Sequence, residues 1–122
     1  MPNDMIKEVA FVAIPVTDKE RARKFYQETL GLKPSLSIHD GMWVEYEIGG
    51  TTIGVGCHPD WKPSRDGTSI SFEVDDIDAT IAKLKKDGVE FEREKFESPI
   101  CFMAVIHDPD GNRLLVHKRK SA

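Results

Sequence analysis

Glu73 and His117 are the two residues of this sequence with the clearest chemistry. A carboxylate opposite an imidazole tunes the ring for proton transfer, and both groups can orient a polar ligand. The alternative is that Glu73 pairs with a surface arginine or lysine, while His117 only begins the charged tail His117-Lys118-Arg119-Lys120. The pair is the candidate acid and base of this protein, provided that the fold brings the two side chains together.

Three further histidines offer ring nitrogens to a metal or a ligand. His39 lies in an expected turn and should be exposed to solvent, whereas His58 opens a linker, where it would be either a lid residue or part of a surface loop. His107 precedes a turn, and we expect its ring to bond to that hairpin. A metal site assembled from His58, His107 or His117 with Glu73 stays open as an alternative.

Two cysteines, Cys57 and Cys101, are the only ones in the chain. Their spacing matches neither a disulfide framework nor a cysteine zinc site, which favours a reducing, cytoplasmic setting. Cys57 should lie on the opposite strand face from Gly54 and Gly56, as a buried thiol rather than a nucleophile. Cysteine chemistry is therefore not expected.

The elements that must hold these residues follow a strand-helix-strands pattern that occurs twice. In the first occurrence residues 9–16 alternate as a strand, and Thr17 and Glu20 fit a capping box that begins a helix. Gly31 is expected to end that helix. Three short strands should follow, at residues 36–38, 43–48 and 52–56.

The second occurrence repeats the same order after an aperiodic linker. Residues 69–74 alternate as a strand, Asp75 or Asp76 caps a helix, and Gly88 ends it. The turn Asp108-Pro109-Asp110-Gly111 should close the last hairpin. Further strands are expected at residues 89–91, 101–107 and 113–118.

Length and composition limit the protein to one small folded unit. The chain has 122 residues, a net charge of −4 and 39% hydrophobic residues, which predicts one domain over residues 1–122. We expect a first module over about 6–57, a linker over about 58–67 and a second module over about 68–120. The acidic charge argues against nucleic acid, and the segment MPNDMIKE and the absence of long apolar runs argue against export and a membrane.

Three segments together resemble the vicinal oxygen chelate superfamily, which includes glyoxalases, bleomycin-resistance proteins and extradiol dioxygenases. They are Val12-Ala13-Ile14-Pro15-Val16-Thr17-Asp18 followed by Phe25-Tyr26 and Leu30-Gly31-Leu32, then Ser71-Phe72-Glu73-Val74-Asp75-Asp76, then Asp108-Pro109-Asp110-Gly111-Asn112. The resemblance covers nearly the whole chain. It implies an α+β fold of two tandem βαβββ modules, which form a curved mixed sheet around a cleft with helices on the convex side.

Metalloenzymes of that group place four ligands on the first and last strands of the two modules. The resemblance aligns those four positions with Phe11, Gly54, Ser69 and Leu115, none of which is a usual metal ligand. We therefore predict no metal and no other cofactor, and the metal-dependent activities of the group are not carried over to this chain.

The cleft itself is expected to remain. Alternation along the strands places a mixed apolar and polar wall on the faces that would hold the metal. Gly54 and Gly56 should leave room for a ligand beside the backbone, and Arg113 could clamp an anionic group. Beside Glu73 and His117, the predicted ligand-binding residues are Phe11, Ala13, Gly54, Gly56, Ser69, Ser71, Arg113 and Leu115.

Three classes of function fit this sequence. The favoured one is a cytoplasmic protein that binds a small organic ligand without a metal, as bleomycin-resistance proteins do, and the resemblance implies a homodimer. The second is a lyase-like or dioxygenase-like enzyme, which would use Glu73 and His117 as acid and base or a displaced metal site. The third is an interaction module whose cleft is filled by its own side chains.

Overall fold

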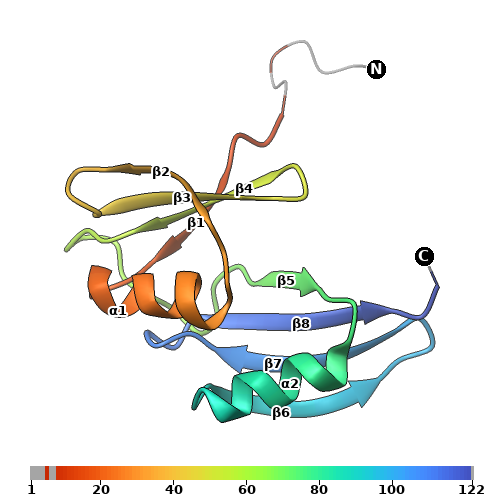
Figure 1. Cartoon of the computed structure of the whole chain (residues 1–122). Helices are drawn as coiled ribbons and strands as arrows, with labels where there is room; N and C mark the ends of the chain where they lie inside the picture. The colour runs from red at the N-terminus through yellow and green to blue at the C-terminus, as the bar shows by residue number, and fades with distance from the viewer. Residues whose placement is uncertain (1–4, 6–7, 122) are drawn as a thin grey trace.

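The computed structural model describes residue 5 and residues 8–121. The chain runs through a strand, a helix and three strands, and then repeats this order (Figure 1). Most of the segment MPNDMIKE and the expected start of the first module at residue 6 lie outside the described residues. No helix of the described part is long and apolar enough to cross a membrane.

The first module forms a four-stranded mixed sheet in the order β1-β4-β3-β2, in which β1 runs parallel to β4. Its helical segment packs on one face of this sheet. The elements are β1 (Val12–Pro15), α1 (Lys19–Arg23), η1 (Lys24–Thr29), β2 (Pro34–Ile38), β3 (Trp43–Ile48) and β4 (Thr51–Gly56).

The second module repeats the topology, with strand order β5-β8-β7-β6 and β5 parallel to β8. Its elements are β5 (Ile70–Glu73), α2 (Ile77–Lys86), β6 (Glu90–Glu97), β7 (Cys101–His107) and β8 (Arg113–Arg119). The chain is therefore an α+β protein of two βαβββ modules. Each module has its own four-stranded mixed sheet, which confirms the predicted pair of βαβββ modules.

The start of the first helix differs from the prediction. Asp18, and not Thr17, is the N-cap, and its carboxylate accepts the backbone N–H groups of Glu20 and Arg21 at 3.1 Å each. The Thr17 hydroxyl bonds instead to Asp110 in the second module. The prediction of a capping box was wrong because a partner distant in the sequence takes up the hydroxyl.

A wide helical turn follows. The backbone N–H of Leu30 bonds to the carbonyl oxygen of Phe25 at 2.9 Å, the i to i−5 pattern of a π-helix. Phe25 and Tyr26 from this segment are buried in the core. In the second module, Asp76 caps α2, one of the two caps that the sequence offered, with its Oδ1 accepting the Ala79 N–H at 3.0 Å.

Strand lengths also differ from the prediction at the edges of the sheets. β1 begins at Val12 rather than at residue 9, and β6 extends to Glu97 although only residues 89–91 were expected. β6 has the sequence EFEREKFE, and its pairing with β7 shifts register twice. The length of β6 is set by its pairing with β7, and such pairing cannot be read from the hydrophobic pattern of β6 alone.

One face of each sheet carries the core, and no helix within residues 8–121 covers the other face. Ile14, Val44 and Val55 of the first sheet and Leu114 and Val116 of the second belong to one buried cluster with residues from α1, η1 and α2. Alternation puts the intervening strand residues on the opposite face, which we call the helix-free face.

The two modules are joined at the turn between β7 and β8. Asp108 is 4% exposed, and its Oδ2 accepts hydrogen bonds from the Tyr26 hydroxyl and from Nδ2 of Asn112, both at 2.8 Å. Its Oδ1 accepts the backbone N–H groups of Asp110 and Asn112 at 2.9 Å each. Burial, followed by the Asp108 carboxylate, raises the pKa of Tyr26 well above its usual range, so the hydroxyl stays protonated and donates.

A second contact at this junction reaches the first strand. Nδ2 of Asn112 also donates to the carbonyl oxygen of Pro15 at 2.8 Å, and Nη2 of Arg21 lies 2.8 Å from Oδ1 of Asp110. The turn that the sequence analysis identified as a hairpin is therefore also the junction between the modules.

Candidate functional site

The structure brings Glu73 and His117 together on the helix-free face of the second sheet. The two residues are register partners on β5 and β8, and Glu73 Oε1 lies 2.6 Å from His117 Nδ1. Glu73 Oε2 accepts the Arg119 backbone N–H at 2.8 Å. These two hydrogen bonds, the backbone one first, lower the pKa of Glu73, so the carboxylate is ionised and the Nδ1 atom of His117 carries the shared proton.

This arrangement leaves Nε2 as the free nitrogen of His117, whose side chain is 21% exposed. Because the carboxylate engages Nδ1, Nε2 is the ring nitrogen that remains for a ligand. The pair can accept a hydrogen bond from a ligand at Nε2, or accept a proton there.

The pH dependence of stability should report on this pair. The pKa of Glu73 is lowered from its ordinary 4.5, so the carboxylate stabilises the fold above that value, and this contribution is lost as the pH falls through the lowered pKa. We expect the stability difference between wild type and Glu73→Gln, measured by urea unfolding, to be full at pH 7 and to shrink progressively as the pH falls below 4.5. The exposed Glu8→Gln serves as the control. A difference that is unchanged from pH 7 to pH 3 would contradict this.

A second polar network, which the sequence analysis missed, lies on β6, β7 and β8. The His107 side chain is buried, and its Nε2 lies 2.7 Å from Oε1 of Glu92, which also accepts from Nε of Arg113 at 3.0 Å. The His107 bond and then the Arg113 bond lower the pKa of Glu92. The prediction that the His107 ring bonds to the hairpin was wrong. The ring instead contacts Glu92 on the neighbouring strand β6.

The helix-free face of the first sheet is aromatic. The indole of Trp43 lies over Gly54 and Gly56, so that a Cβ atom added to Gly54 would be 2.2 Å from Cζ2 of Trp43, and one added to Gly56 would be 2.6 Å from Cζ3 of Trp61. Phe11 stands edge-on to Trp43, with ring centroids 5.1 Å apart. The room that the two glycines were expected to leave for a ligand is therefore filled by the indoles.

The two modules meet beside this face at a hollow of about 290 Å³. Ala13 and Pro15 of β1, Arg113 of β8 and Trp61 of the linker are among the residues that line it. We call it the seam hollow. Of the predicted ligand-binding residues it contains Ala13 and Arg113, while Ser71 and Leu115 lie further along the second sheet as register partners, and Ser69 directly precedes β5.

The four positions aligned with metal ligands do not fit a divalent metal. Phe11 packs on Trp43, Gly54 lies under the same indole, and Leu115 offers only hydrocarbon. Of the four, only the Ser69 hydroxyl is an oxygen donor. Among residues 8–121, no three His, Cys, Asp or Glu side chains converge as a metal site would require.

The remaining histidines lie apart from Glu73. His39 is exposed in a turn with φ of 54°, and Nδ1 of His58 accepts the backbone N–H of Asp60 at 3.1 Å. The displaced metal site built from His58, His107 or His117 with Glu73 is therefore not assembled among the described residues.

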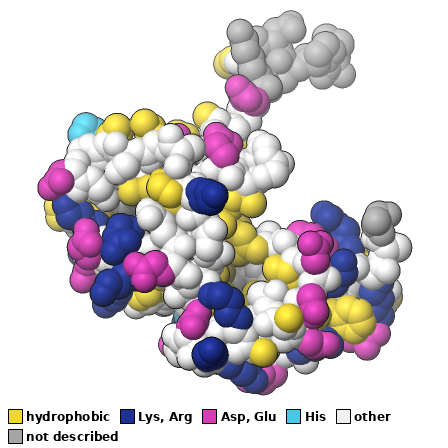
Figure 2. All heavy atoms as spheres, in the orientation of Figure 1, with side chains coloured by type: hydrophobic (Ala, Val, Ile, Leu, Met, Phe, Trp, Pro, Cys, Tyr) yellow, Lys and Arg dark blue, Asp and Glu magenta, His cyan; other side chains and the backbone are white. Residues whose placement is uncertain are grey.

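Two of the hollows on the helix side of the sheets bear on the site. The larger, about 530 Å³, is a mostly apolar groove between the modules that includes Leu30, Leu32, Ile48 and Phe72, and Figure 2 shows hydrophobic side chains on the wall between the two modules. Only Glu73 among the predicted site residues lines it.

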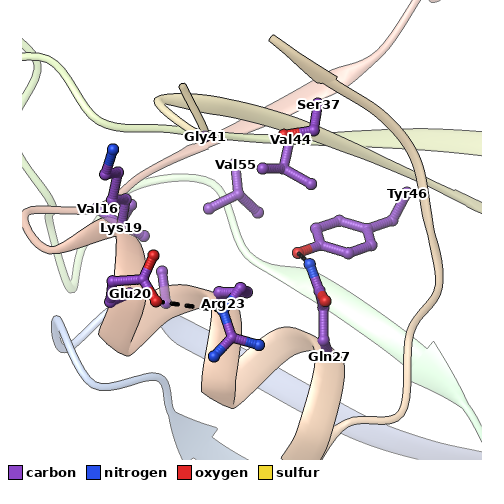
Figure 3. Close-up of a pocket in the computed structure, with 11 residues that line it drawn as sticks. Val16, Lys19, Glu20, Arg23, Gln27, Ser37, Gly41, Val44, Tyr46 and Val55 are labelled. Atoms are coloured by element: carbon purple, nitrogen blue, oxygen red, sulfur yellow. Dashed lines mark hydrogen bonds and ion pairs between the residues drawn. The ribbon is translucent and has the colours of Figure 1, made fainter. Parts of the chain in front are cut away.

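The smaller cavity lies between α1, η1 and the first sheet (Figure 3). Nε2 of Gln27 donates there to the Tyr46 hydroxyl at 3.2 Å, and burial raises the pKa of Tyr46. Its volume is about 70 Å³, whereas small-molecule sites usually measure about 300–1,000 Å³. This cavity is too small for a drug-sized ligand.

Comparisons with known proteins agree with this architecture. A model of the Glyoxalase/Bleomycin resistance protein/Dioxygenase superfamily matches residues 8–116. The uncharacterized protein YetH of Bacillus subtilis (strain 168) is 31% identical over 120 residues, which cover 92% of this chain and 98% of YetH.

Two solved structures are also similar. TnmS3, an antibiotic binding protein from Streptomyces sp. CB03234, superimposes with a TM-score of 0.79 at 27% identity, over 97% of this chain and 100% of TnmS3. A member of the glyoxalase/bleomycin resistance protein/dioxygenase superfamily from Sphaerobacter thermophilus DSM 20745 gives 0.76 at 29% identity, over 93% of this chain and 98% of its own.

Proposed function

Because the chain belongs to the Glyoxalase/Bleomycin resistance protein/Dioxygenase superfamily, we propose that it binds a small organic molecule at its helix-free faces without a divalent metal. The observation that carries this proposal is the residue set at the four ligand positions, Phe11, Gly54, Ser69 and Leu115, combined with a seam hollow of about 290 Å³ that Ala13 and Arg113 line. The similarity to an antibiotic binding protein supports the same function.

The proposed roles of the site residues follow from their chemistry. Phe11, Ala13 and Leu115 supply apolar contact area, while Ser69, Ser71 and Arg113 supply hydrogen-bond donors that orient the ligand. Gly54 and Gly56 act indirectly, because they let the two indoles lie close to the sheet. Glu73 and His117 add a polar pair to the proposed ligand-binding residues.

We also propose that the protein is a cytoplasmic homodimer. Both sheets have open edges at β1 and β5, and large apolar side chains remain exposed, among them Leu36 at 42%, Ile38 at 40% and Ile100 at 75%. A second copy would cover such residues. Light scattering after gel filtration tests this, with a mass twice the 13.7 kDa of the chain expected and a single-chain mass excluding the dimer.

Binding is tested first by native mass spectrometry of protein purified without a metal-affinity tag, followed by calorimetric titration with a panel of aromatic antibiotics. We expect no stoichiometric metal, and saturable binding of at least one organic compound. Ala13→Leu, which fills the seam hollow, should weaken that binding at least tenfold, whereas Ala10→Leu, an exposed position before β1, should leave it unchanged. A stoichiometric divalent metal, or no saturable ligand, would overturn the proposal.

An enzymatic function is the second candidate, of the lyase or dioxygenase type. The 2.6 Å contact between Glu73 and His117 favours it, because it holds the imidazole as a proton acceptor on an open face. The test is conversion of the compound that the titration identifies. Loss of its pH-rate profile in His117→Ala would support acid-base catalysis, and unchanged turnover would exclude His117 from the mechanism.

A further inference from the structure

We propose that His107 is a pH-dependent latch for the linker of residues 58–67. The latch holds the linker against the second module while the ring is neutral and releases it when the ring is protonated. It can do so because Nδ1 of His107 faces two partners, Arg65 of the linker and Glu90 of β6, which it cannot bond at the same time. This inference rests on the proposed function and names a regulation of the same site, because the linker forms part of the wall of the seam hollow.

One nitrogen of the His107 ring has a fixed role. Nε2 lies 2.7 Å from Oε1 of Glu92 on β6, and the same oxygen accepts from Nε of Arg113 at 3.0 Å. The His107 bond and then the Arg113 bond lower the pKa of Glu92, so its carboxylate is ionised and can only accept. Nε2 therefore carries a proton in both states of the ring, and Nδ1 is the atom at which His107 gains or loses one.

The other nitrogen has two neighbours of opposite charge. Nη2 of Arg65 lies 3.5 Å from Nδ1 of His107, and Oε2 of Glu90 lies 3.3 Å from it. A guanidinium can only donate a hydrogen bond, and a carboxylate can only accept one. Neutral Nδ1 therefore accepts from Arg65, whereas protonated Nδ1 donates to Glu90 and repels the guanidinium. The charge of one buried ring thus decides whether Arg65 is held.

The linker runs from β4 of the first module to β5 of the second (Figure 1). On the first module the Trp61 ring lies so close to β4 that a Cβ atom added to Gly56 would be 2.6 Å from its Cζ3. On the second module, within the described part of the chain, the contact of Arg65 with His107 is the one side-chain hydrogen bond that attaches the linker. Trp61 and Ser64 line the seam hollow, so release of Arg65 would loosen one wall of that hollow.

The other charged groups that face His107 come from the elements on all sides of it. One part lies on β6, on β8 and in the junction turn, and the other part lies across a hollow of about 380 Å³ that His107 lines. Together they carry no net charge, so the exchange between Arg65 and Glu90 is the main difference between the two protonation states. The carboxylates are Glu92, Asp108 and Asp87, and the cations are Arg113, Arg21 and Lys24.

Acrylamide quenching of the tryptophan fluorescence measures whether the linker is attached. Trp43 and Trp61 are the only tryptophans, and both rings lie at Gly56, so a linker that lifts away exposes both to the quencher. We would measure the Stern–Volmer constant of the whole protein from pH 8 to pH 5, the range in which histidine ordinarily changes its charge. The measurement needs no ligand, so its outcome does not depend on the proposed function.

We expect the quenching constant of the wild type to rise at least twofold between pH 8 and pH 5. His107→Gln should remove this pH dependence, because an amide does not titrate. Arg65→Ala should show at pH 8 the constant that the wild type reaches at pH 5. Because Arg65 is exposed, this variant should fold even if His107→Gln does not.

His58→Asn is the matched control, because His58 is the histidine of the linker itself. Its Nδ1 accepts the backbone N–H of Asp60 at 3.1 Å, a bond that the oxygen of an asparagine can also accept. This variant should keep the full pH dependence of the wild type.

Three results would overturn the latch. An equal wild-type constant at pH 8 and pH 5 would show that the linker stays attached in both states. Wild-type quenching of Arg65→Ala at pH 8 would show that Arg65 does not hold the linker. A pH dependence that persists in His107→Gln and disappears in His58→Asn would identify His58 as the sensor. None of these results bears on small-molecule binding itself, which calorimetric titration tests separately at a single pH.

Discussion

Replacing Asp108 with alanine is expected to lower the free energy of unfolding by about 3 to 4 kcal/mol. The side chain is buried and accepts four hydrogen bonds, two from backbone N–H groups and two from the side chains of Tyr26 and Asn112. Alanine would leave those donors without an acceptor in the interior, including a hydroxyl on a residue that is 0% exposed. Urea unfolding followed by circular dichroism measures the loss.

Two variants separate this effect from simple loss of charge. Tyr26→Phe removes one donor and leaves the carboxylate with its other three bonds, so it should cost only about 1 kcal/mol. Asp75→Ala removes an exposed carboxylate and should have almost no effect. If Asp108→Ala cost no more than Tyr26→Phe, water would have to enter the junction and replace the carboxylate.

The second large effect is expected from Gly54→Ala. The new methyl group would lie 2.2 Å from Cζ2 and 2.3 Å from Cη2 of Trp43, so the indole must leave its place against β4. We expect a destabilisation of about 1–3 kcal/mol from overpacking, a shift of the tryptophan emission to longer wavelength and the loss of ligand binding on this face. Fluorescence and near-ultraviolet circular dichroism would detect the displaced ring.

Gly67→Ala is the matched control for that substitution. A Cβ atom there would meet its nearest atom, the Ser64 carbonyl oxygen, at 3.5 Å, which is an ordinary contact. This variant should keep the emission and the stability of the wild type. An unchanged spectrum for Gly54→Ala would show that Trp43 does not need the glycine beneath it.

Features fixed by short-range contacts could be predicted from the sequence. Asp76 caps α2 through a bond to the N–H three residues later, and Ile77, Ile81 and Leu84 bury one stripe of that helix, so spacing along the chain was sufficient. The placement of Glu73 and His117 on one face was also predictable, because the resemblance put ligand positions on the first and last strands of the second module and alternation then assigned both side chains to that face.

Features fixed by distant partners could not be predicted in this way. Thr17 has the spacing of a cap, but Asp110 lies 93 positions further on and binds its hydroxyl. Trp43 fills the room above Gly54 and Gly56 because of the direction in which its side chain points. Strand alternation predicts the face on which a side chain lies but not its direction on that face. The Glu92 contacts likewise depend on a shift of register between β6 and β7.

The hydrogen bonds between the modules also determine when the protein can finish folding during its synthesis. Tyr26 and Asp108 are 82 positions apart, and Pro15 and Asn112 are 97 apart. The first module leaves the ribosome long before its partners exist, and closing loops of this length is entropically unfavourable until the contacts form. The last hairpin to be made thus completes the first helix, and a nascent chain that stops at the linker presents an unfinished module to proteases and chaperones.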